Sequence, residues 1–130
     1  DLTVARFVGD LNEVSARVIE VADGLARLQS SLGPLVSTQA NVGAGTQVVC
    51  AVRPEHLQVR AGEVATAPNE AVATVRAVIF GGSWHRVDLE LPSRIAWRAE
   101  GRGEPPPVEE GGKVIVSFDA NRLMLFSDKE

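Results

Sequence analysis

The chain has 130 residues, a formal net charge of −4 and one cysteine, Cys50, so an internal disulfide is excluded. No apolar run reaches the roughly 18 residues of a membrane-spanning helix, and no run of Lys and Arg favours a nucleic acid as partner. Valine is abundant and aromatic residues make up only 5%, which favours strands because β-branched side chains pack well on a pleated surface.

Residues 1–12 differ in pattern from the remainder of the chain and predict a short helix or an extended lead-in. Because residue 1 is Asp rather than Met, we expect the chain to be a fragment of a longer protein. We expect residues 1–12 to be the connection from a preceding domain. The alternation of apolar and polar residues from Val14 to Val18 predicts a half-buried strand. Asp23 and Gly24 then predict a hairpin with a type I′ turn, which needs a positive φ at both central residues.

The next apolar segment, 46–52, predicts a buried strand that contains Cys50 as an inert thiol. A short strand is expected at 57–60, and the polar residues 62–70 predict a flexible loop. The second half predicts strands over 71–80, 85–91, around 95–97, 113–118 and 123–126. Since no segment keeps a helical period over three turns, the predicted fold class is all-β, with about eight to ten short strands.

The chain also resembles itself. Residues 45–59 align with 111–125, with Gly45 on Gly111, and residues 16–29 align with 75–88, with Arg17 on Arg76. We therefore predict two pseudo-repeated β units, about 14–59 and 73–125, packed into one domain. Units of about five strands often form partly open Greek-key barrels, so the expected architecture is a pair of small barrels of the oligonucleotide/oligosaccharide-binding (OB) type.

The stretch "VVCAVRPEHLQV" places Arg53, Pro54, Glu55 and His56 together between apolar residues. These side chains could form an acid/base or metal site, or they could mark the corner between two strands. Pro54 favours the corner because it lacks an N–H group and ends a strand ladder. We expect Arg53 and Glu55 to tie this corner to its neighbours by charge-assisted hydrogen bonds or to contact another domain. The repeat agrees, since the equivalent "DANR" also separates a buried strand from a short apolar one.

Other candidate sites have simpler explanations. His56 and His85 have no near-sequence partners at a useful spacing, so no metal site is predicted. The sequence has no GxSxG motif, and no catalytic residue is predicted. Trp84 and Trp97 could stack on a sugar or base, but core or interface packing is favoured because single-strand binders use several aromatic residues. Trp84 follows two glycines in a predicted turn, which leaves a contact role open.

Three segments resemble one known family. "FVGDLN", "VRPEHL" and "GGKVIVSFDANRLMLF" resemble the accessory C-terminal transport-associated OB (TOBE) domain of bacterial ABC-importer ATP-binding subunits. In the family, a Phe-x-Gly-x-x-Asn segment leads out of the nucleotide-binding domain, and Phe7, Gly9 and Asn12 match it. An apolar-Arg-Pro-Glu motif follows a buried strand, and here it spans residues 52–55.

The resemblance implies a regulatory, dimer-supporting domain over 13–130 that follows an absent N-terminal ATPase domain. That ATPase domain would hold ATP and Mg, while this chain, which has no GxxxxGK[ST] phosphate loop, would hold no cofactor. The implied partners are its own ATPase domain, a second copy of the subunit and, through the ATPase domain, membrane permease subunits. The implied location is cytoplasmic, at the inner face of the cell membrane.

The cargo of such an importer is left open among polyamines, iron and sugars, because the two ends of the chain resemble different subgroups. An alternative function, from another class, is a β domain that binds a small ligand of the oxyanion type through hydroxyl and backbone N–H groups. Binding of a single-stranded oligonucleotide is a third hypothesis, which the acidic balance disfavours.

Overall fold

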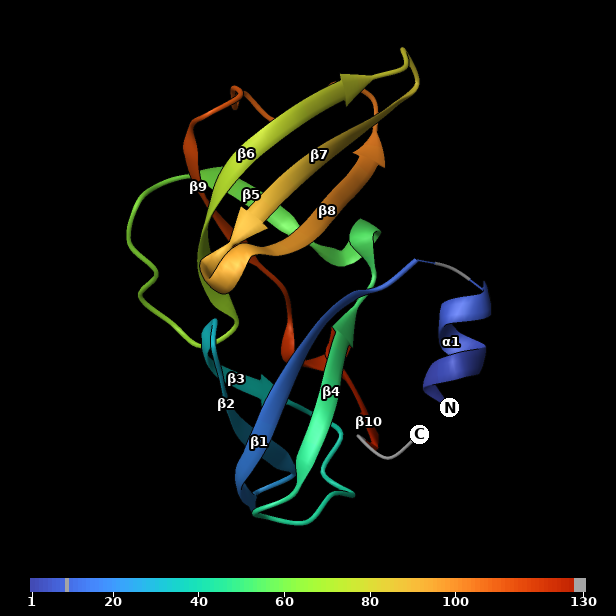
Figure 1. Cartoon of the computed structure of the whole chain (residues 1–130), viewed down its shortest axis with the longest axis vertical. Helices are drawn as coiled ribbons and strands as arrows, with labels where there is room; N and C mark the ends of the chain where they lie inside the picture. The colour runs from blue at the N-terminus through green and yellow to red at the C-terminus, as the bar shows by residue number, and fades with distance from the viewer. Residues whose placement is uncertain (9, 128–130) are drawn as a thin grey trace.

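A computed structural model describes residues 1–8 and 10–127, in which two five-stranded antiparallel sheets follow one short helix (Figure 1). The helix and strands are α1 Leu2–Val8, β1 Asn12–Ala22, β2 Leu25–Ser30, β3 Gly33–Ser37, β4 Gln47–Val52, β5 Gln58–Ala61, β6 Glu70–Phe80, β7 Trp84–Leu91, β8 Ile95–Arg102, β9 Lys113–Ser117 and β10 Met124–Ser127. Three 3₁₀ turns are η1 Pro54–His56, η2 Pro92–Arg94 and η3 Ala120–Arg122. Within the described ranges, no helix is long and apolar enough to cross a membrane.

The two sheets confirm the predicted pair of β units. Their strand orders are β10-β4-β1-β2-β3 and β5-β9-β6-β7-β8, so β6 to β9 repeat the pairing of β1 to β4. The final strand of each unit is exchanged. β10, the last strand of the second unit, pairs with β4, whereas β5 of the first unit pairs with β9 (Figure 1). The units are therefore interlocked rather than placed side by side.

The structural register corrects part of the predicted alignment. Val18 N–H donates to Thr46 O over 2.9 Å, and Val75 N–H donates to Gly112 O over the same distance. A β-bulge follows each of these valines, between Val18 and Glu20 and between Val75 and Ala77. Val18 is therefore the equivalent of Val75.

In this register Arg17 of the first unit is equivalent to Thr74 of the second unit, not to Arg76. The predicted alignment of the first strands was therefore wrong by two residues. The predicted alignment matched the two turns to each other, but the turns differ in length. The first hairpin closes through Asp23 and Gly24 alone, with φ of 55° and 76°, which confirms the type I′ prediction. The second hairpin has a longer connection after Phe80, which pairs with His85.

β3 is a strand that the sequence reasoning did not predict. Gly33 and Pro34 begin it, and both residues are typical of turns. Pro34 is tolerated because β3 is an edge strand, paired only with β2, where a missing N–H group breaks no second ladder.

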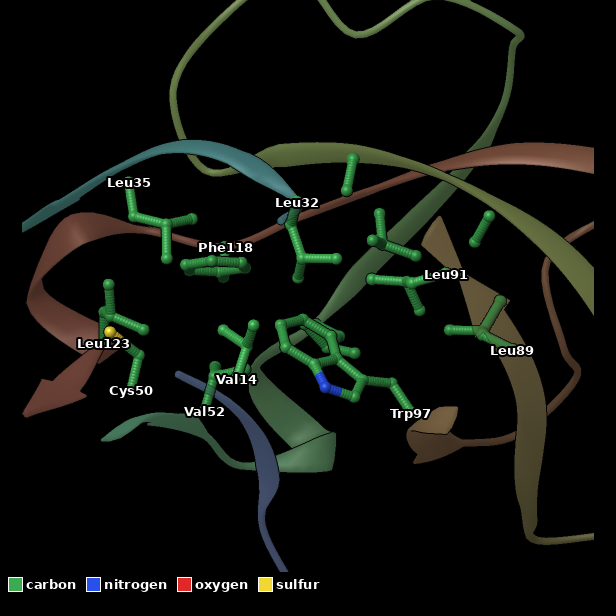
Figure 2. Packing of buried hydrophobic residues seen from close by; sticks show 14 of the residues in the cluster. Val14, Leu32, Leu35, Cys50, Val52, Leu89, Leu91, Trp97, Phe118 and Leu123 are labelled. Atoms are coloured by element: carbon green, nitrogen blue, oxygen red, sulfur yellow. The ribbon is translucent and has the colours of Figure 1, made fainter. Parts of the chain in front are cut away.

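A single apolar core joins the two units. Figure 2 shows Val14 and Val52 from the first sheet and Leu89 and Leu91 from the second within one cluster, with the indole of Trp97 between the two pairs. The rings of Trp97 and Phe118 are neighbours in this cluster, with centroids 6.1 Å apart and a tilt of 55°. Because the shared cluster draws on both sheets, neither unit has a separate core, as expected for one domain.

Cys50 lies in this core and is fully buried, as the sequence predicted. Burial raises the pKa of its thiol to about 12, because the charged thiolate would lose its hydration. The thiol is therefore inert near neutral pH.

Candidate functional site

The Arg53–His56 segment forms a corner between β4 and β5. Arg53 is extended, Pro54 is buried at the start of η1, and His56 N–H closes the turn on Arg53 O over 2.9 Å. The second unit has the same turn, where Arg122 N–H donates to Asp119 O over 2.9 Å. This arrangement agrees with the strand–corner–strand interpretation of the motif.

The side chains of Arg53 and Glu55 do not hold the corner as expected. Neither makes a hydrogen bond or an ion pair with any other residue that the structure describes. The corner instead contacts β8 of the other sheet through η1, with Pro54 buried. Glu55 is exposed, and its carboxylate is available for contacts outside its own corner.

Asn12 joins the two sheets where β1 begins. Its Nδ2 donates to Arg98 O over 2.8 Å, and its Oδ1 accepts from Arg98 N–H over 2.8 Å. Only 4% of Asn12 is exposed, and next to it Trp97 Nε1 donates to Glu13 O over 3.0 Å. The amide therefore satisfies backbone groups at the edge of β8 as a neighbouring strand would.

Asn69 makes the same contacts from the second unit. Its Nδ2 donates to Val36 O over 2.9 Å, its Oδ1 accepts from Val36 N–H over 2.9 Å, and only 6% of the residue is exposed. Sequence reasoning missed Asn69 because it ends a polar loop. The signal that could have found it is its equivalence to Asn12, which appears only in the correct register of the repeat.

Glu55 and Trp84, both predicted contact residues, lie at one groove. This open groove of about 400 Å³, called here the Trp84 groove, is lined by Glu55, Trp84, His85, Glu100, Gly101 and Arg102. Trp84 is 47% exposed, and its indole covers Gly81, where an added Cβ would come within 2.5 Å of the ring. His85 Nδ1 lies 3.0 Å from Gly103 O.

A second groove, of about 410 Å³, carries mainly paired charges on the outer face of β6, β7 and β8. Its ion pairs join Arg76 to Glu90 at 2.7 Å, Arg86 to Asp88 at 3.0 Å, and Arg98 to Asp10 at 3.2 Å. Among residues 1–8 and 10–127, no group of three or more His, Cys, Asp or Glu is placed to hold a metal ion.

The family is decided by one match. The family model described as the TOBE domain matches residues 50–126 of this chain, which include the second half of β4 and all of η1. The chain belongs to the TOBE domain family. The match ends at Phe126, so the exchanged strand β10 lies almost entirely within the TOBE match.

A curated relative is similar over nearly the whole chain. The spermidine/putrescine import ATP-binding protein PotA of Ruegeria pomeroyi is 33% identical over 131 residues, which cover 98% of this TOBE chain and 35% of PotA. The chain thus spans about a third of the length of that relative.

A solved structure has the same fold. The cytoplasmic molybdate-binding protein ModG, in a crystal form with molybdate bound, aligns with a TM-score of 0.73 at 16% identity and covers 89% of this chain and 95% of ModG. This similarity confirms the predicted paired OB-like architecture of the TOBE chain.

Part of the expected lead-in, residues 1–12, is the short helix α1. In α1, Arg6 Nε donates to Glu13 Oε2 over 2.7 Å, which joins the helix to β1 of the TOBE domain. Of the three lead-in residues singled out, only Asn12 has a side chain that the structure describes. Gly9 and the side chain of Phe7 lie outside the described part of the chain.

Proposed function

We propose that this TOBE domain is the regulatory, dimer-supporting part of an ABC-importer ATP-binding subunit, and that the importer carries polyamines. The observation that carries the proposal is the match to PotA, which extends over 98% of the chain and thus includes the lead-in and both units. The domain itself would perform no catalysis. ATP and Mg would bind in an ATPase domain preceding residues 1–12, on the cytoplasmic side of the membrane.

The interlocked units suit a domain that transmits force between subunits. Exchanged strands, a common core and two asparagine clamps oppose independent movement of the two sheets. In this proposal, the domain moves as one body and stabilises one arrangement of two ATPase subunits over another. The permease subunits would be reached only through the ATPase domains.

The reading frame upstream of Asp1 in the gene tests whether the chain is part of an ATP-binding subunit. We expect it to encode a nucleotide-binding domain with a GxxxxGK[ST] phosphate loop. If the upstream frame encodes no such domain, the chain is not part of an ATP-binding subunit, and the proposal is wrong.

Oxyanion binding is a second candidate function, favoured by a specific groove. This groove, of about 300 Å³, is lined in part by Thr74, Ser93, Arg94 and Lys113, and Lys113 Nζ donates to Thr74 Oγ1 over 2.8 Å. Two cations beside two hydroxyl groups suit a tetrahedral oxyanion, and the one carboxylate that lines this groove, Glu90, is paired with Arg76 at 2.7 Å. Calorimetric titration with molybdate, sulfate and phosphate tests it. Tight binding that Lys113→Gln weakens would support it, and absence of heat would dismiss it.

A further inference from the structure

Side-chain amides seal three of the four strands that lie at the edges of the two described sheets. The edge strands are β3 and β10 in the first sheet and β5 and β8 in the second. The amide of Asn69 occupies both backbone groups of one β3 residue, and the amide of Asn12 does the same on β8. On β10, Leu125 N–H donates to Gln39 Oε1. Backbone groups that are occupied in this way cannot pair with a further strand.

The fourth edge strand, β5, has no such seal. The matching turns make Val59 in β5 the equivalent of Leu125 in β10. The pairing of β2 with β3 and of β7 with β8 makes Gly101 the equivalent of Gln39, so the second unit has a glycine where the first has its sealing amide. Within residues 1–8 and 10–127, Val59 makes no hydrogen bond outside its ladder with β9. The outer edge of β5 is therefore open.

Two residues of β5 direct their backbone polar groups away from β9. Leu125 N–H points to the outside of β10, so the equivalent group of Val59 points to the outside of β5. The N–H and C=O groups of one strand residue point to one side and those of the next residue point to the other side, so Ala61 also points outward. The open edge thus offers the donors and acceptors of Val59 and Ala61 to an extended segment.

The side chains along this edge form an apolar face and a polar face. Val59 packs against the apolar core, whereas Gln58 and Arg60 are exposed. Ala61 lines an open groove of about 450 Å³. The other apolar side chains of that groove are Pro107, Val108 and Val114. A strand paired with β5 would place every second side chain on the side of this groove and the others beside Gln58 and Arg60.

The polar face favours acidic side chains in an added strand. Arg60 Nη2 donates to Glu70 Oε2 over 3.1 Å, but the Arg60 side chain is 53% exposed and has further N–H groups to donate. Glu109 and Lys113, the charged residues of the groove, have opposite signs and leave the groove without a net charge. A carboxylate opposite Arg60 would form a cross-strand ion pair, and a lysine or arginine in the same place would be repelled.

We propose that the open edge of β5 binds an extended segment of a partner protein by strand addition. The segment would alternate apolar and acidic residues, with the apolar side chains toward the groove and the acidic ones toward Arg60. Backbone hydrogen bonds to Val59 and Ala61 would supply affinity, and the two faces of the edge would supply specificity. The proposal goes beyond the role of the domain in an ATP-binding subunit and does not depend on it.

Peptide titration of the 130-residue chain tests whether such a segment binds. The probe is the capped peptide GEVEVEG, and the readout is the backbone amide signal of each residue in two-dimensional NMR. We expect saturable shifts that are largest at Val59 and Ala61. The capped peptide GKVKVKG, which reverses the charges, should bind about two- to fivefold more weakly. Absence of saturable shifts at Val59 and Ala61 with GEVEVEG would overturn the inference.

Methylation of the peptide nitrogens separates strand addition from attraction by charge. In the proposed pairing the two valines lie opposite Val59 and Ala61, so their N–H groups face β5 and those of the glutamates face away. N-methylation of both valines should weaken binding about tenfold, because two hydrogen bonds are lost. N-methylation of the glutamates, the matched control, should leave the shifts at Val59 in place. An equal loss with either peptide, or no loss with either, would contradict strand addition.

A proline at Val59 tests the same edge from the protein side. Because proline is tolerated in an edge strand where the N–H group faces solvent, Val59→Pro should fold and bind the peptide about two- to tenfold more weakly. Val59→Ala, which keeps the N–H group, is the matched control. Arg60→Gln should weaken binding about two- to fivefold, compared with Arg122→Gln, an exposed arginine outside this edge. Circular dichroism checks folding, and if Val59→Pro does not fold, the methylated peptides decide.

Sedimentation equilibrium without peptide examines the competing occupant of the edge, a second copy of this chain. The expected result is a monomer, or a dimer that Val59→Pro leaves intact. A dimer that Val59→Pro abolishes, while Val59→Ala retains it, would assign the β5 edge to self-pairing and overturn the inference.

Discussion

Asn12 and Asn69 occupy equivalent positions in the two units, and each side-chain amide holds the backbone of the other unit's third strand. Asn12 bonds both backbone groups of Arg98 in β8, and Asn69 bonds both backbone groups of Val36 in β3. The clamps and the exchanged strands β5 and β10 act in the same direction. Both make the folding of either unit depend on the other.

Removal of one clamp should destabilise the whole domain. Asn12→Ala leaves the Arg98 N–H and C=O groups without their partners, and we expect the free energy of unfolding to fall by about 1–3 kcal/mol. Asn69→Ala should have a similar effect. Urea denaturation measures both, and the matched control is the exposed Asn41→Ala, expected to stay within about 0.5 kcal/mol. A loss for Asn12→Ala no larger than that of the control would contradict the clamp.

Gly81→Ala should displace the Trp84 indole. The new Cβ would lie 2.5 Å from ring atoms, a distance that forces the ring or the hairpin to move. We expect a shift in Trp84 emission and a stability loss of about 1–3 kcal/mol. Gly43→Ala is the control, since its Cβ would meet only Thr46 at 3.7 Å, an ordinary contact. Unchanged emission in Gly81→Ala would mean that the ring does not cover this glycine.

Cys50 should make stability fall at high pH. Its folded-state pKa is raised to about 12, above an unfolded value of about 8.5, so the unfolded chain loses its thiol proton first. The contribution of the neutral Cys50 thiol to the free energy of unfolding is fully present below about pH 8.5 and is lost as the pH rises toward 12. Thermal unfolding of the wild type and Cys50→Ala between pH 7 and 10 measures the difference. Parallel pH profiles of the two proteins would contradict this role.

Glu70 should make the stability of the fold decrease at low pH, whereas Cys50 makes it decrease at high pH. The pKa of its carboxyl is lowered, first by the hydrogen bond from Thr66 N–H and then by the bond from Arg60. The ionised Glu70 carboxylate stabilises the fold at pH values above its unfolded-state pKa of about 4.3. This stabilisation is lost as the pH falls through the lower pKa of the folded state. Glu70→Gln should therefore flatten the acid limb of the stability profile. An acid limb that is unchanged in Glu70→Gln would exclude this carboxylate as its source.

Local patterns predicted much of this fold. The alternation from Val14 to Val18 and the Asp23-Gly24 turn correctly predicted β1 and its hairpin, because both depend on neighbouring residues. The exchange of β5 and β10 could not be predicted, since two short strands of similar pattern can each pair with either sheet. Pairing over that distance depends on the closed core rather than on local preference.

The candidate site was predictable only in part. Glu55 and Trp84 were each singled out, Glu55 by its motif and Trp84 by its glycine turn, but nothing in the sequence placed them at one groove. The contact between η1 and β8 brings Glu55 to β8, and the pairing of Trp84 with Arg102 of β8 brings Trp84 to the same groove. Arg53 was expected either to tie its own corner or to contact another domain, and its side chain makes no hydrogen bond or ion pair with the described residues. Within the chain, the buried Pro54 is what anchors the corner.

Uptake of labelled putrescine tests the central claim most directly. Cells in which the gene for this chain is deleted should lose putrescine uptake and regain it when the full-length gene is restored. The same cells should take up molybdate at the normal rate. Normal putrescine uptake together with lost molybdate uptake in the deletion strain would contradict the polyamine-importer account.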